Sequence, residues 1–502
     1  MEKSAKVIAV DIGASGGKCF AGAFDGRGFS LREVHRFSHE PTSIYMADRS
    51  GRVEERSFWD ELFIYAQIVQ GLRAYRREVA ETADSIGIDA WGADGALVTE
   101  DGVTLGPVYC YRDHRLDGMV EQVKARLDAR RIYEITGIHF QPFNVSNQLF
   151  WFLQNRAGLV KKGVRFLPIT SLFSYYLGGV TAVDSSWASV TQLMDSKKRK
   201  WSREILKGLG IPAWLMPEIV APGTIVGEIR AGLAESLGLN RTRIVAVGSH
   251  DTASAYAAAP IGNPANALII SSGTWSLVGK LVRKPVTSEE AMLANISNEG
   301  GIGNIRLLKN CMGTWLVQEL RRAWRARDGR ELDWEEMNRM TEKGTPFAAF
   351  IDPDERSFFN PSNMEDAIIA FCRRTGQEPP RDRGTMLRVV YESLALKYRF
   401  VAEQISAVSG KPNSVIHIVG GGSKNAFLNQ LAANACGVKV VAGPEEATAV
   451  GNAMVQALGL GVIGKLSEAK SMIRAAFPIR EFAPRERETW EKAYTKFRTF
   501  VK

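Results

Sequence analysis

Two stretches of the chain share one layout, in which an apolar run, a turn of glycine and hydroxyl residues and a second apolar run follow one another. They are Val7–Phe24 and Ala267–Val282. Short apolar runs bounded by small residues predict buried strands, and the turns between them predict two β-hairpins. The 502 residues exceed the size of a single hydrophobic core, so we expect two domains of about 200 to 250 residues each. A hairpin at the head of each half predicts a weak internal duplication.

The turn of the first hairpin, between Gly13 and Lys18, is a candidate phosphate site. Glycine lets the backbone approach a ligand closely, and successive N–H groups in such a turn form a concavity that binds anions. Lys18 adds positive charge, and Asp11 can hold Mg²⁺ through water, because hard cations prefer oxygen ligands. An ordinary tight hairpin explains the same residues, and this stretch alone does not separate the two interpretations.

Two familiar motifs occur in the wrong context. Gly13–Gly17 fits the G-x-S-x-G elbow of serine hydrolases, but that motif requires a helix after the serine, and Lys18–Phe24 predicts a strand. Gly459–Gly464 fits G-x-G-x-x-G, yet it follows a helical stretch and not a strand. The sequence contains no G-x-x-x-x-G-K-[ST] motif, so we expect no P-loop.

Near the middle of the chain, Ile244–Ser254 passes from an apolar run directly into Ser249, His250, Asp251 and Thr252. In open α/β sheets, ligands bind beyond the carboxyl ends of such strands. We therefore predict that Asp251 is the catalytic base that abstracts a proton from the substrate.

Several stretches in the first half combine regular structure with polar groups. Apolar spacing predicts a helix at Phe58–Leu72 and a strand in Ser85–Gly95, where Trp91 either belongs to the core or stacks on a sugar ring. Pro107–Arg115 predicts a strand that runs into a charged cluster, which is either a structural ion-pair network or part of a site. The amides and aromatic rings of Thr136–Gln148 suit a pocket for a neutral polyol, although loop packing explains them equally well.

The second half offers candidates for binding a nucleotide. Gly273 and Thr274, in the second hairpin turn, are placed to donate hydrogen bonds to a second phosphate. Asn310 lies near the junction of a predicted strand and a predicted helix. A strand, a three-glycine turn and a helix are predicted in Ser414–Gly437; three glycines can lie flat against adenine, or they can serve close helix–sheet packing. From this last segment we select Gly421, Gly422 and Asn425.

Composition narrows the class of protein. The formal charge of +9 includes clusters such as Lys197–Lys200 and Arg321–Arg327, which we interpret as solvated faces; no basic stripe with interleaved aromatics predicts nucleic-acid binding. The five cysteines are far apart and predict reduced thiols. No signal peptide is expected, because Met1–Lys6 leads directly into a strand, and no apolar segment approaches the ~18 residues of a membrane helix. We therefore expect a cytoplasmic enzyme or binding protein without a membrane partner. A monomer or a homodimer is also expected.

The motifs resemble those of the FGGY carbohydrate kinases, a family of the actin and sugar-kinase superfamily, and within it the branch that uses L-rhamnulose. The resemblance covers roughly Val7 to Gly459. It implies an α/β fold of two ribonuclease-H-like (actin-like ATPase) domains with a cleft between them, with a sugar-binding side at 1–247 and a nucleotide-binding side at 248–502. The matching motifs are Asp11–Lys18, Gly87–Asp94, Tyr111–Arg115, Ser249–Ser254, Ser271–Ser276, Asn295–Gly301 and His417–Gly422.

The resemblance also implies roles for individual residues. Asp251 is similar to the family's base for the sugar hydroxyl, and sugar contacts are implied for Gly92, His250, Thr252 and Asn310. Contacts with ATP are implied for Ala14, Ser15, Gly16, Gly17, Lys18, Thr274, Gln318 and Gly421.

We therefore expect an ATP- and Mg²⁺-dependent kinase that phosphorylates the 1-hydroxyl of L-rhamnulose. The sequence departs from the pattern of that branch at Lys18, Gly95 and Val145–Asn147, which leaves L-fuculose, L-xylulose and L-ribulose as alternatives. A regulatory sugar-binding protein without turnover is the alternative from another functional class, although binding sugar alone requires no phosphate turns.

Overall fold

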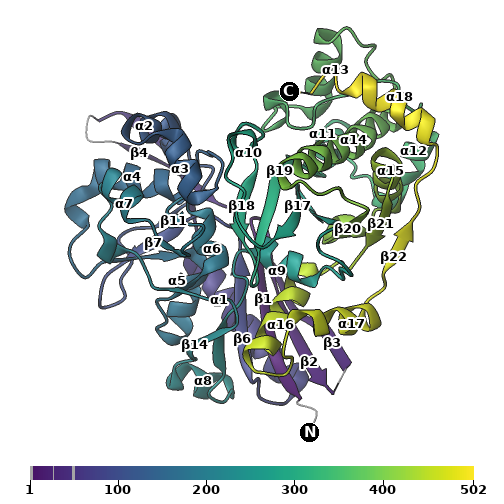
Figure 1. Cartoon of the computed structure of the whole chain (residues 1–502). Coiled ribbons are helices and arrows are strands. Elements are labelled where there is room, and N and C mark those ends of the chain that lie inside the picture. Colours follow the sequence, from purple (N-terminus) through teal and green to yellow (C-terminus); the bar gives the residue numbers. More distant parts are fainter. Residues whose placement is uncertain (1–3, 27, 48–50, 502) are drawn as a thin grey trace. The chain divides into compact units, whose positions relative to one another are not determined.

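The first glycine hairpin supplies two neighbouring strands of a six-stranded sheet (Figure 1). The computed structural model describes residues 4–26, 28–47 and 51–501; Met1 to Lys3, on which part of the expectation about the chain's start rests, lie outside these ranges. The sheet order is β14-β15-β6-β1-β2-β3. Its strands are β1 (Ala5–Gly13), β2 (Gly16–Asp25), β3 (Gly28–Ser38), β6 (Ser85–Ala90), β14 (Thr224–Glu228) and β15 (Arg243–Ala246). β1 pairs antiparallel with β2 and parallel with β6, so the predicted hairpin is confirmed.

The second predicted hairpin is the corresponding part of a seven-stranded sheet with the order β18-β19-β17-β16-β20-β21-β22. Its strands are β16 (Ala267–Ser272), β17 (Trp275–Val282), β18 (Ser297–Gly300), β19 (Ile305–Met312), β20 (Val415–Val419), β21 (Lys439–Ala442) and β22 (Arg480–Phe482). β16 pairs antiparallel with β17 and parallel with β20, as β1 pairs with β2 and β6. In both sheets a further parallel strand and then an antiparallel strand follow. The repeated pairing order supports the predicted internal duplication.

The chain divides into two compact units. The first comprises Met1–Pro260, Val282–Leu307 and Ala447–Ala476, and the second comprises Ile261–Leu281, Leu308–Glu446 and Phe477–Lys502. The division that we predicted at residue 247, with a sugar side and a nucleotide side, stays a prediction.

The helices of the first unit are α1 (Glu61–Val79), α2 (Met119–Arg126), α3 (Ala129–Thr136), α4 (Val145–Arg156), α5 (Ile169–Gly178), α6 (Ser185–Val190), α7 (Arg203–Gly208), α8 (Ala231–Leu237), α9 (Asp251–Ala258), α10 (Glu289–Leu293), α16 (Ala447–Gly459) and α17 (Leu466–Ala476). Those of the second unit are α11 (Trp315–Asp328), α12 (Trp334–Lys343), α13 (Met364–Arg374), α14 (Arg383–Ser409), α15 (Ala426–Cys436) and α18 (Arg487–Phe497). Small sheets pair β4 (Thr42–Ala47) with β5 (Val53–Trp59) and β8 (Val108–Tyr109), and β7 (Gly95–Val98) with β9 (Arg165–Pro168). Two-stranded sheets pair β10 (Val183–Asp184) with β13 (Ile219–Val220) and β11 (Met194–Asp195) with β12 (Lys200–Trp201).

The helix predicted at Phe58–Leu72 begins later, at Glu61. Phe58 and Trp59 belong to β5, where they pair with Tyr109 and Val108. Asp60 then starts the helix, because its side chain accepts a hydrogen bond from the Phe63 N–H at 2.9 Å. The cap residue, and not the apolar spacing, therefore sets this boundary.

Other expectations from the sequence are confirmed. The residues after the Gly13–Gly17 turn form strand β2, and Gly459 ends helix α16, so neither the serine-hydrolase nor the dinucleotide motif has its required context. All five cysteines are free, and four of them are buried. Crossing a bilayer would require a longer or more apolar helix than any within the described ranges.

A buried ladder of polar side chains ties α16 to the first sheet. Gln456 donates to the backbone oxygen of Ile8 at 3.0 Å and accepts from the Ser85 hydroxyl at 2.7 Å. Asn452 donates to the Gly87 oxygen at 3.1 Å and to Asp89 at 2.5 Å. Because an unpaired buried amide is costly, these bonds specify how α16 lies on β1 and β6.

Helices α9 and α16 approach to backbone contact, and Figure 1 shows them side by side. A Cβ added at Gly451 would lie only 1.8 Å from the backbone oxygen of Ser254. No rotation of a side chain relieves a clash with backbone, so this crossing requires glycine. Since α9 begins at Asp251, the crossing also decides where that carboxylate lies.

We predict that Gly451→Ala lowers the Tm, because overpacking at a helix crossing costs roughly 1–3 kcal/mol or more. The matched control is Gly232→Ala in α8, where an added Cβ meets nothing within 4 Å. That control should leave the Tm unchanged or raise it slightly, because alanine is the better helix former. Equal Tm values for the two variants by differential scanning fluorimetry would contradict the proposed crossing.

Candidate functional site

Asp251 is the first residue of α9 and lies five residues beyond the last residue of β15. The loop before it is held by Asp184, whose carboxylate accepts hydrogen bonds from the N–H and the hydroxyl of Ser249. Ser249 in turn accepts, through its backbone oxygen, a bond from the Ala90 N–H at 2.9 Å. Burial raises the pKa of Asp184 above its ordinary value, although the bonds from Ser186 and Ser249 oppose this. Sequence reasoning missed Asp184, because nothing near it in sequence indicates its partner.

The Asp251 carboxylate is partly open, with 31% of its side chain exposed. One oxygen accepts hydrogen bonds from the N–H and the hydroxyl of Thr252, at 2.5 and 3.0 Å. The same oxygen lies 3.4 Å from Nε2 of His250. Of the predicted sugar-contacting residues, the structure thus brings His250, Asp251 and Thr252 together.

Gly92 completes this group. A Cβ added to Gly92 would lie 2.8 Å from Nε2 of His250, closer than real Cβ contacts allow. The glycine is therefore needed for the imidazole to lie against the end of β6. We name Gly92, His250, Asp251 and Thr252 the acceptor cluster; their contact with a sugar stays a prediction.

Trp91, the other predicted sugar contact, is only 7% exposed. Its ring packs on Trp59 with a centroid distance of 4.5 Å, and its indole N–H donates to Asp94 at 3.1 Å. These contacts favour the core interpretation of Trp91, and stacking on a sugar stays a prediction.

Asp94 accepts several hydrogen bonds among these packed aromatic rings. Its carboxylate accepts from the indole N–H of Trp59 at 2.7 Å, from the Tyr111 N–H at 3.0 Å and from the Gln148 amide at 3.1 Å, in addition to Trp91. Burial raises the pKa of Asp94 to about 6, although these donors and Arg115 oppose the shift. The residue has a left-handed backbone, with φ 69°.

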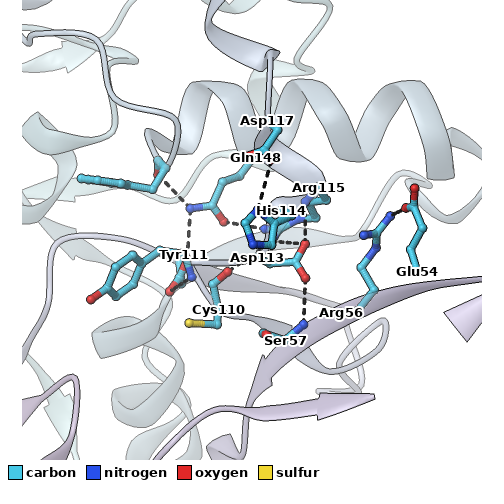
Figure 2. Close-up of polar contacts among 12 residues, drawn as sticks. Glu54, Arg56, Ser57, Cys110, Tyr111, Asp113, His114, Arg115, Asp117 and Gln148 are labelled. Carbon is cyan, nitrogen blue, oxygen red and sulfur yellow. Dashed lines mark hydrogen bonds and ion pairs between the residues drawn. The ribbon is translucent and has the colours of Figure 1, made fainter. Parts of the chain in front are cut away.

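Figure 2 shows the charged cluster at Tyr111–Arg115. The buried Arg115 contacts Asp113 at 3.4 Å and the Gln148 amide oxygen at 3.1 Å, and its guanidinium lies 4.1 Å from the Tyr109 ring centroid. Asp113 also accepts from the Ser57 N–H at 2.7 Å. These contacts support the structural ion-pair network, one of the two interpretations of the sequence.

The amide-rich loop at Thr136–Gln148 is bound largely to itself. Asn147 donates to the backbone oxygens of Gln141 and Pro142, at 2.8 and 3.0 Å. The amide nitrogen of Gln141 donates to Nε2 of His139 at 2.7 Å. Gln148 donates to Phe143 O at 2.9 Å. Loop packing therefore explains most of these amides.

The turn of the first hairpin consists of Ala14 and Ser15, between the paired Gly13 and Gly16. Gly16 and Gly17 lie against β3, since a Cβ at either would meet Phe37 at 2.5 or 2.4 Å. The ring of His39 lies next to the turn, with its Nε2 2.8 Å from the backbone oxygen of Gly13. Packing alone thus requires these two glycines, and phosphate binding by Ala14–Lys18 stays a prediction.

Asp11 pairs with Lys18 across the same hairpin. Next to it in the sheet, burial raises the pKa of Asp89 well above its ordinary value, and the negative charges of Asp11 and Asp251 raise it further. The protonated form of Asp89 is therefore favoured beside Asp11. Within the described ranges, no three His, Cys, Asp or Glu side chains gather as a metal cage.

In the second unit, the predicted residues of the second hairpin turn meet the start of α11. The backbone oxygen of Gly273 accepts from the N–H and the hydroxyl of Thr314, at 3.0 and 2.8 Å, and Thr274 O accepts from Gly313 N at 3.0 Å. Gln318 donates to the Thr314 hydroxyl at 3.2 Å. Thr314 thus connects Gly273 with Gln318, while its neighbour Gly313 bonds to Thr274. The sequence analysis missed Thr314, although it stands at the start of a predicted helix.

The three glycines after β20 divide into two kinds. Gly420 has φ 83°, and a Cβ at Gly422 would lie 2.1 Å from the Ser272 hydroxyl, so both serve close packing. An added Cβ at Gly421 meets nothing within 4 Å, which leaves this position open to a ligand. Asn425 caps α15 by accepting from the Leu428 N–H at 2.9 Å.

Asn310 lies in β19, and its amide oxygen is buried without a hydrogen-bond partner among the described residues. A buried orphan acceptor is costly, and a ligand hydroxyl or N–H would satisfy it. This supports a ligand contact for Asn310, which stays a prediction.

Comparison with known proteins extends over almost the whole chain. Residues 7–258 match the model of the N-terminal domain of the FGGY family of carbohydrate kinases, and residues 268–460 match that of its C-terminal domain. The chain is 36% identical to a rhamnulokinase of Bacteroides thetaiotaomicron over 99% of both chains. It is 38% identical to a rhamnulokinase of Mannheimia succiniciproducens and 34% to one of Bacillus subtilis, each over 95% of both chains.

Solved structures share the fold. A gluconate kinase from Lactobacillus acidophilus is similar with a TM-score of 0.77 at 18% identity, covering 99% of this chain and 97% of that one. A Plasmodium falciparum glycerol kinase with ADP has a TM-score of 0.77 at 16% identity, covering 98% and 97%. The predicted two-domain α/β fold of the actin-like ATPase type is thereby confirmed.

The first prediction from this geometry concerns Gly92→Ala. We expect a roughly tenfold rise in KM for the predicted sugar with little change in KM for ATP, because the new methyl group displaces the His250 ring. Gly158→Ala is the matched control, since an added Cβ there meets nothing within 4 Å. Steady-state kinetics in which both variants match the parent would remove His250 from the neighbourhood of the sugar.

The second prediction concerns pH. The pKa of Asp94 is about 6 in the folded protein against an ordinary 3.8, so between these values the unfolded chain loses the proton that the folded chain keeps. Its contribution to stability is therefore full below pH 4 and falls as pH rises through 6, by at most about 3 kcal/mol. The Tm of the parent minus that of Asp94→Asn should decrease between pH 4.5 and 7 in about that window. A difference that is constant with pH would show that Asp94 does not titrate there.

Proposed function

Because the chain belongs to the FGGY family of carbohydrate kinases, we propose that it transfers the terminal phosphoryl group of ATP to the 1-hydroxyl of L-rhamnulose. The rhamnulokinases at 34–38% identity, which match at least 95% of this chain, support that substrate. The observation that carries the proposal is the acceptor cluster, in which the partly exposed Asp251 carboxylate lies beside His250 and Gly92.

The proposed reaction needs little covalent chemistry from the protein. The sugar O1 forms a bond to the γ-phosphorus while the bond from that phosphorus to the β–γ bridging oxygen breaks, and ADP leaves. Asp251 orients the hydroxyl and accepts its proton late, when the oxygen has begun to bond to phosphorus. His250 and Thr252 hold the sugar in the geometry that makes this step effectively unimolecular.

Asp11 is the residue that would hold Mg²⁺. A carboxylate oxygen suits a hard cation, and the raised pKa of the neighbouring Asp89 favours its neutral form, which leaves Asp11 as the proposed acidic ligand. The lack of a cage of three acidic, His or Cys ligands in the described ranges agrees with a cation held mainly by phosphate oxygens and water. When bound, Mg²⁺ would neutralise charge on the transferred phosphoryl group.

For the nucleotide, the first hairpin turn at Ala14–Lys18 and the second turn at Gly273–Thr274 are the proposed phosphate contacts, with Gln318 and the open position Gly421 near the base. Thr314 and Asn425 hold these segments in place through the hydrogen bonds described above. The similar glycerol kinase that contains ADP supports nucleotide binding by this fold. We expect a monomer or a homodimer in the cytoplasm.

The test of the base is Asp251→Asn. We predict that kcat falls about 10²–10⁴-fold, the usual contribution of general-base catalysis, while binding of the ketose stays measurable by calorimetry. Near-normal turnover would remove Asp251 from this role.

The test of the substrate is a panel of L-rhamnulose, L-fuculose, L-xylulose and L-ribulose with ATP and Mg²⁺. We expect the highest kcat/KM with L-rhamnulose and sugar-dependent release of ADP. A higher value for another ketose would leave the kinase assignment and overturn the substrate. Binding of a ketose without ADP release from any of them would favour the non-catalytic regulator.

A further inference from the structure

The motif Asn295–Gly301 resembles the family in sequence, but neither it nor the residues that follow to Arg306 have a role in the proposed reaction so far. It forms β18 and the start of β19, in the first unit. Two charged side chains of this segment are almost completely buried: Glu299 is 4% exposed and Arg306 0%. Buried charges require partners. These two side chains contact each other, and both also lie close to His250.

Arg306 contacts the side of the imidazole that faces away from Asp251. Its Nη2 lies 3.0 Å from Nδ1 of His250 and 3.1 Å from Oε2 of Glu299. Its Nε donates to the backbone oxygen of Gly300 at 2.9 Å. The guanidinium is thus held at two separate points and has little freedom to turn away from the ring.

This contact determines which ring nitrogen carries the proton. A guanidinium has only N–H donors, so a hydrogen bond with Nδ1 requires that Nδ1 presents its lone pair. In a neutral imidazole, the proton then lies on Nε2. Nε2 is the nitrogen that lies 3.4 Å from Asp251 and beside Gly92, in the acceptor cluster.

The doubly protonated ring is the competing state. Nδ1 also lies 3.4 Å from Oε2 of Glu299, and an N–H on Nδ1 could donate to that carboxylate. It would then face the N–H of Arg306 at 3.0 Å, with two donors opposed. Burial would raise the pKa of Glu299, but the adjacent Arg306 guanidinium is the largest of the influences that lower it to about 2. Glu299 therefore stays ionised and balances the charge of Arg306, so the site holds one buried cation and one buried anion.

We propose that Arg306, paired with Glu299, is a positioning residue that holds His250 as the neutral Nε2–H tautomer, so that His250 donates a hydrogen bond to an oxygen of the bound ketose. The identity of that ligand rests on the proposed function; the tautomer does not. The proposal leaves the proton-accepting role to Asp251, because a ring whose Nε2 carries the proton cannot take another there.

The first experiment needs no substrate. In the full-length protein with ¹⁵N-labelled histidine, the His250 signals among the six histidines are those lost in His250→Gln. We expect two well-separated nitrogen shifts at pH 7, with the coupling pattern of a ring protonated on Nε2. Similar shifts for both nitrogens, which indicate an imidazolium, or protonation on Nδ1 would overturn the proposal.

The second experiment uses Arg306→Met, which keeps the length of the side chain and removes its donors, and Arg306→Lys, which keeps one charged donor group. With whichever ketose the parent turns over, we expect Arg306→Met to raise KM for the sugar about tenfold and leave KM for ATP within twofold, and Arg306→Lys to recover part of the loss. If Arg306 served only the stability of the fold, Arg306→Met would lower the Tm and change both KM values to the same extent. That result would contradict the proposal.

Arg115→Met is the matched control, since Arg115 is also a buried arginine of the first unit that contacts an aspartate and an aromatic ring. It should lower the Tm but leave the His250 nitrogen shifts unchanged, whereas Arg306→Met should move them. Equal spectra for the parent and Arg306→Met would overturn the proposal. If no ketose is phosphorylated, the proposed function fails, but the spectrum of the parent still decides the tautomer.

Discussion

Helix α9 carries Asp251 to its position because Gly451 of α16 has no side chain. The backbone of α16 lies directly on that of α9 at Ser254, and any Cβ at residue 451 would meet its carbonyl oxygen. The same helix is bound to β1 and β6 through Gln456 and Asn452. One helix from the last part of the chain therefore fixes the relation between the central sheet of the first unit and the first residue of α9. The acceptor cluster depends on this arrangement.

Buried carboxylates around this cluster differ in charge because their surroundings differ. Burial and two acidic neighbours raise the pKa of Asp89 and favour its protonated form. Glu299 has Arg306 and His250 beside it and is ionised even in acid. Asp94 lies between these limits, since burial opposes its four donors. Asp251, by contrast, is partly open to solvent and has room for a substrate. Side chains that all end in a carboxyl group thus differ in charge and exposure because their neighbours differ.

Much of the fold could be predicted, because it rests on local patterns. The alternation of apolar runs and glycine turns predicted both hairpins, and the polar end of Ile244–Ser254 marked Asp251. The boundary at Asp60 was missed, because an apolar strand end at Phe58–Trp59 continued the helical spacing. Asp184, His39, Thr314 and Arg306 were missed, because each acts on a residue that is distant in sequence.

The sequence by itself determined the elements, the duplicated hairpins and the residue types that suit a sugar kinase, since periodicity and turn chemistry act over a few neighbouring positions. It left two explanations open for Trp91, for the glycines at 420–422 and for the charged cluster at Arg115. Only the tertiary structure shows which of these side chains are packed in the interior and which positions are open. The reason is that packing depends on atoms that are distant in sequence but lie within a few ångströms. The tertiary structure also provided the contact on which the proton position proposed for His250 rests, because a buried arginine from a distant strand faces one nitrogen of its ring.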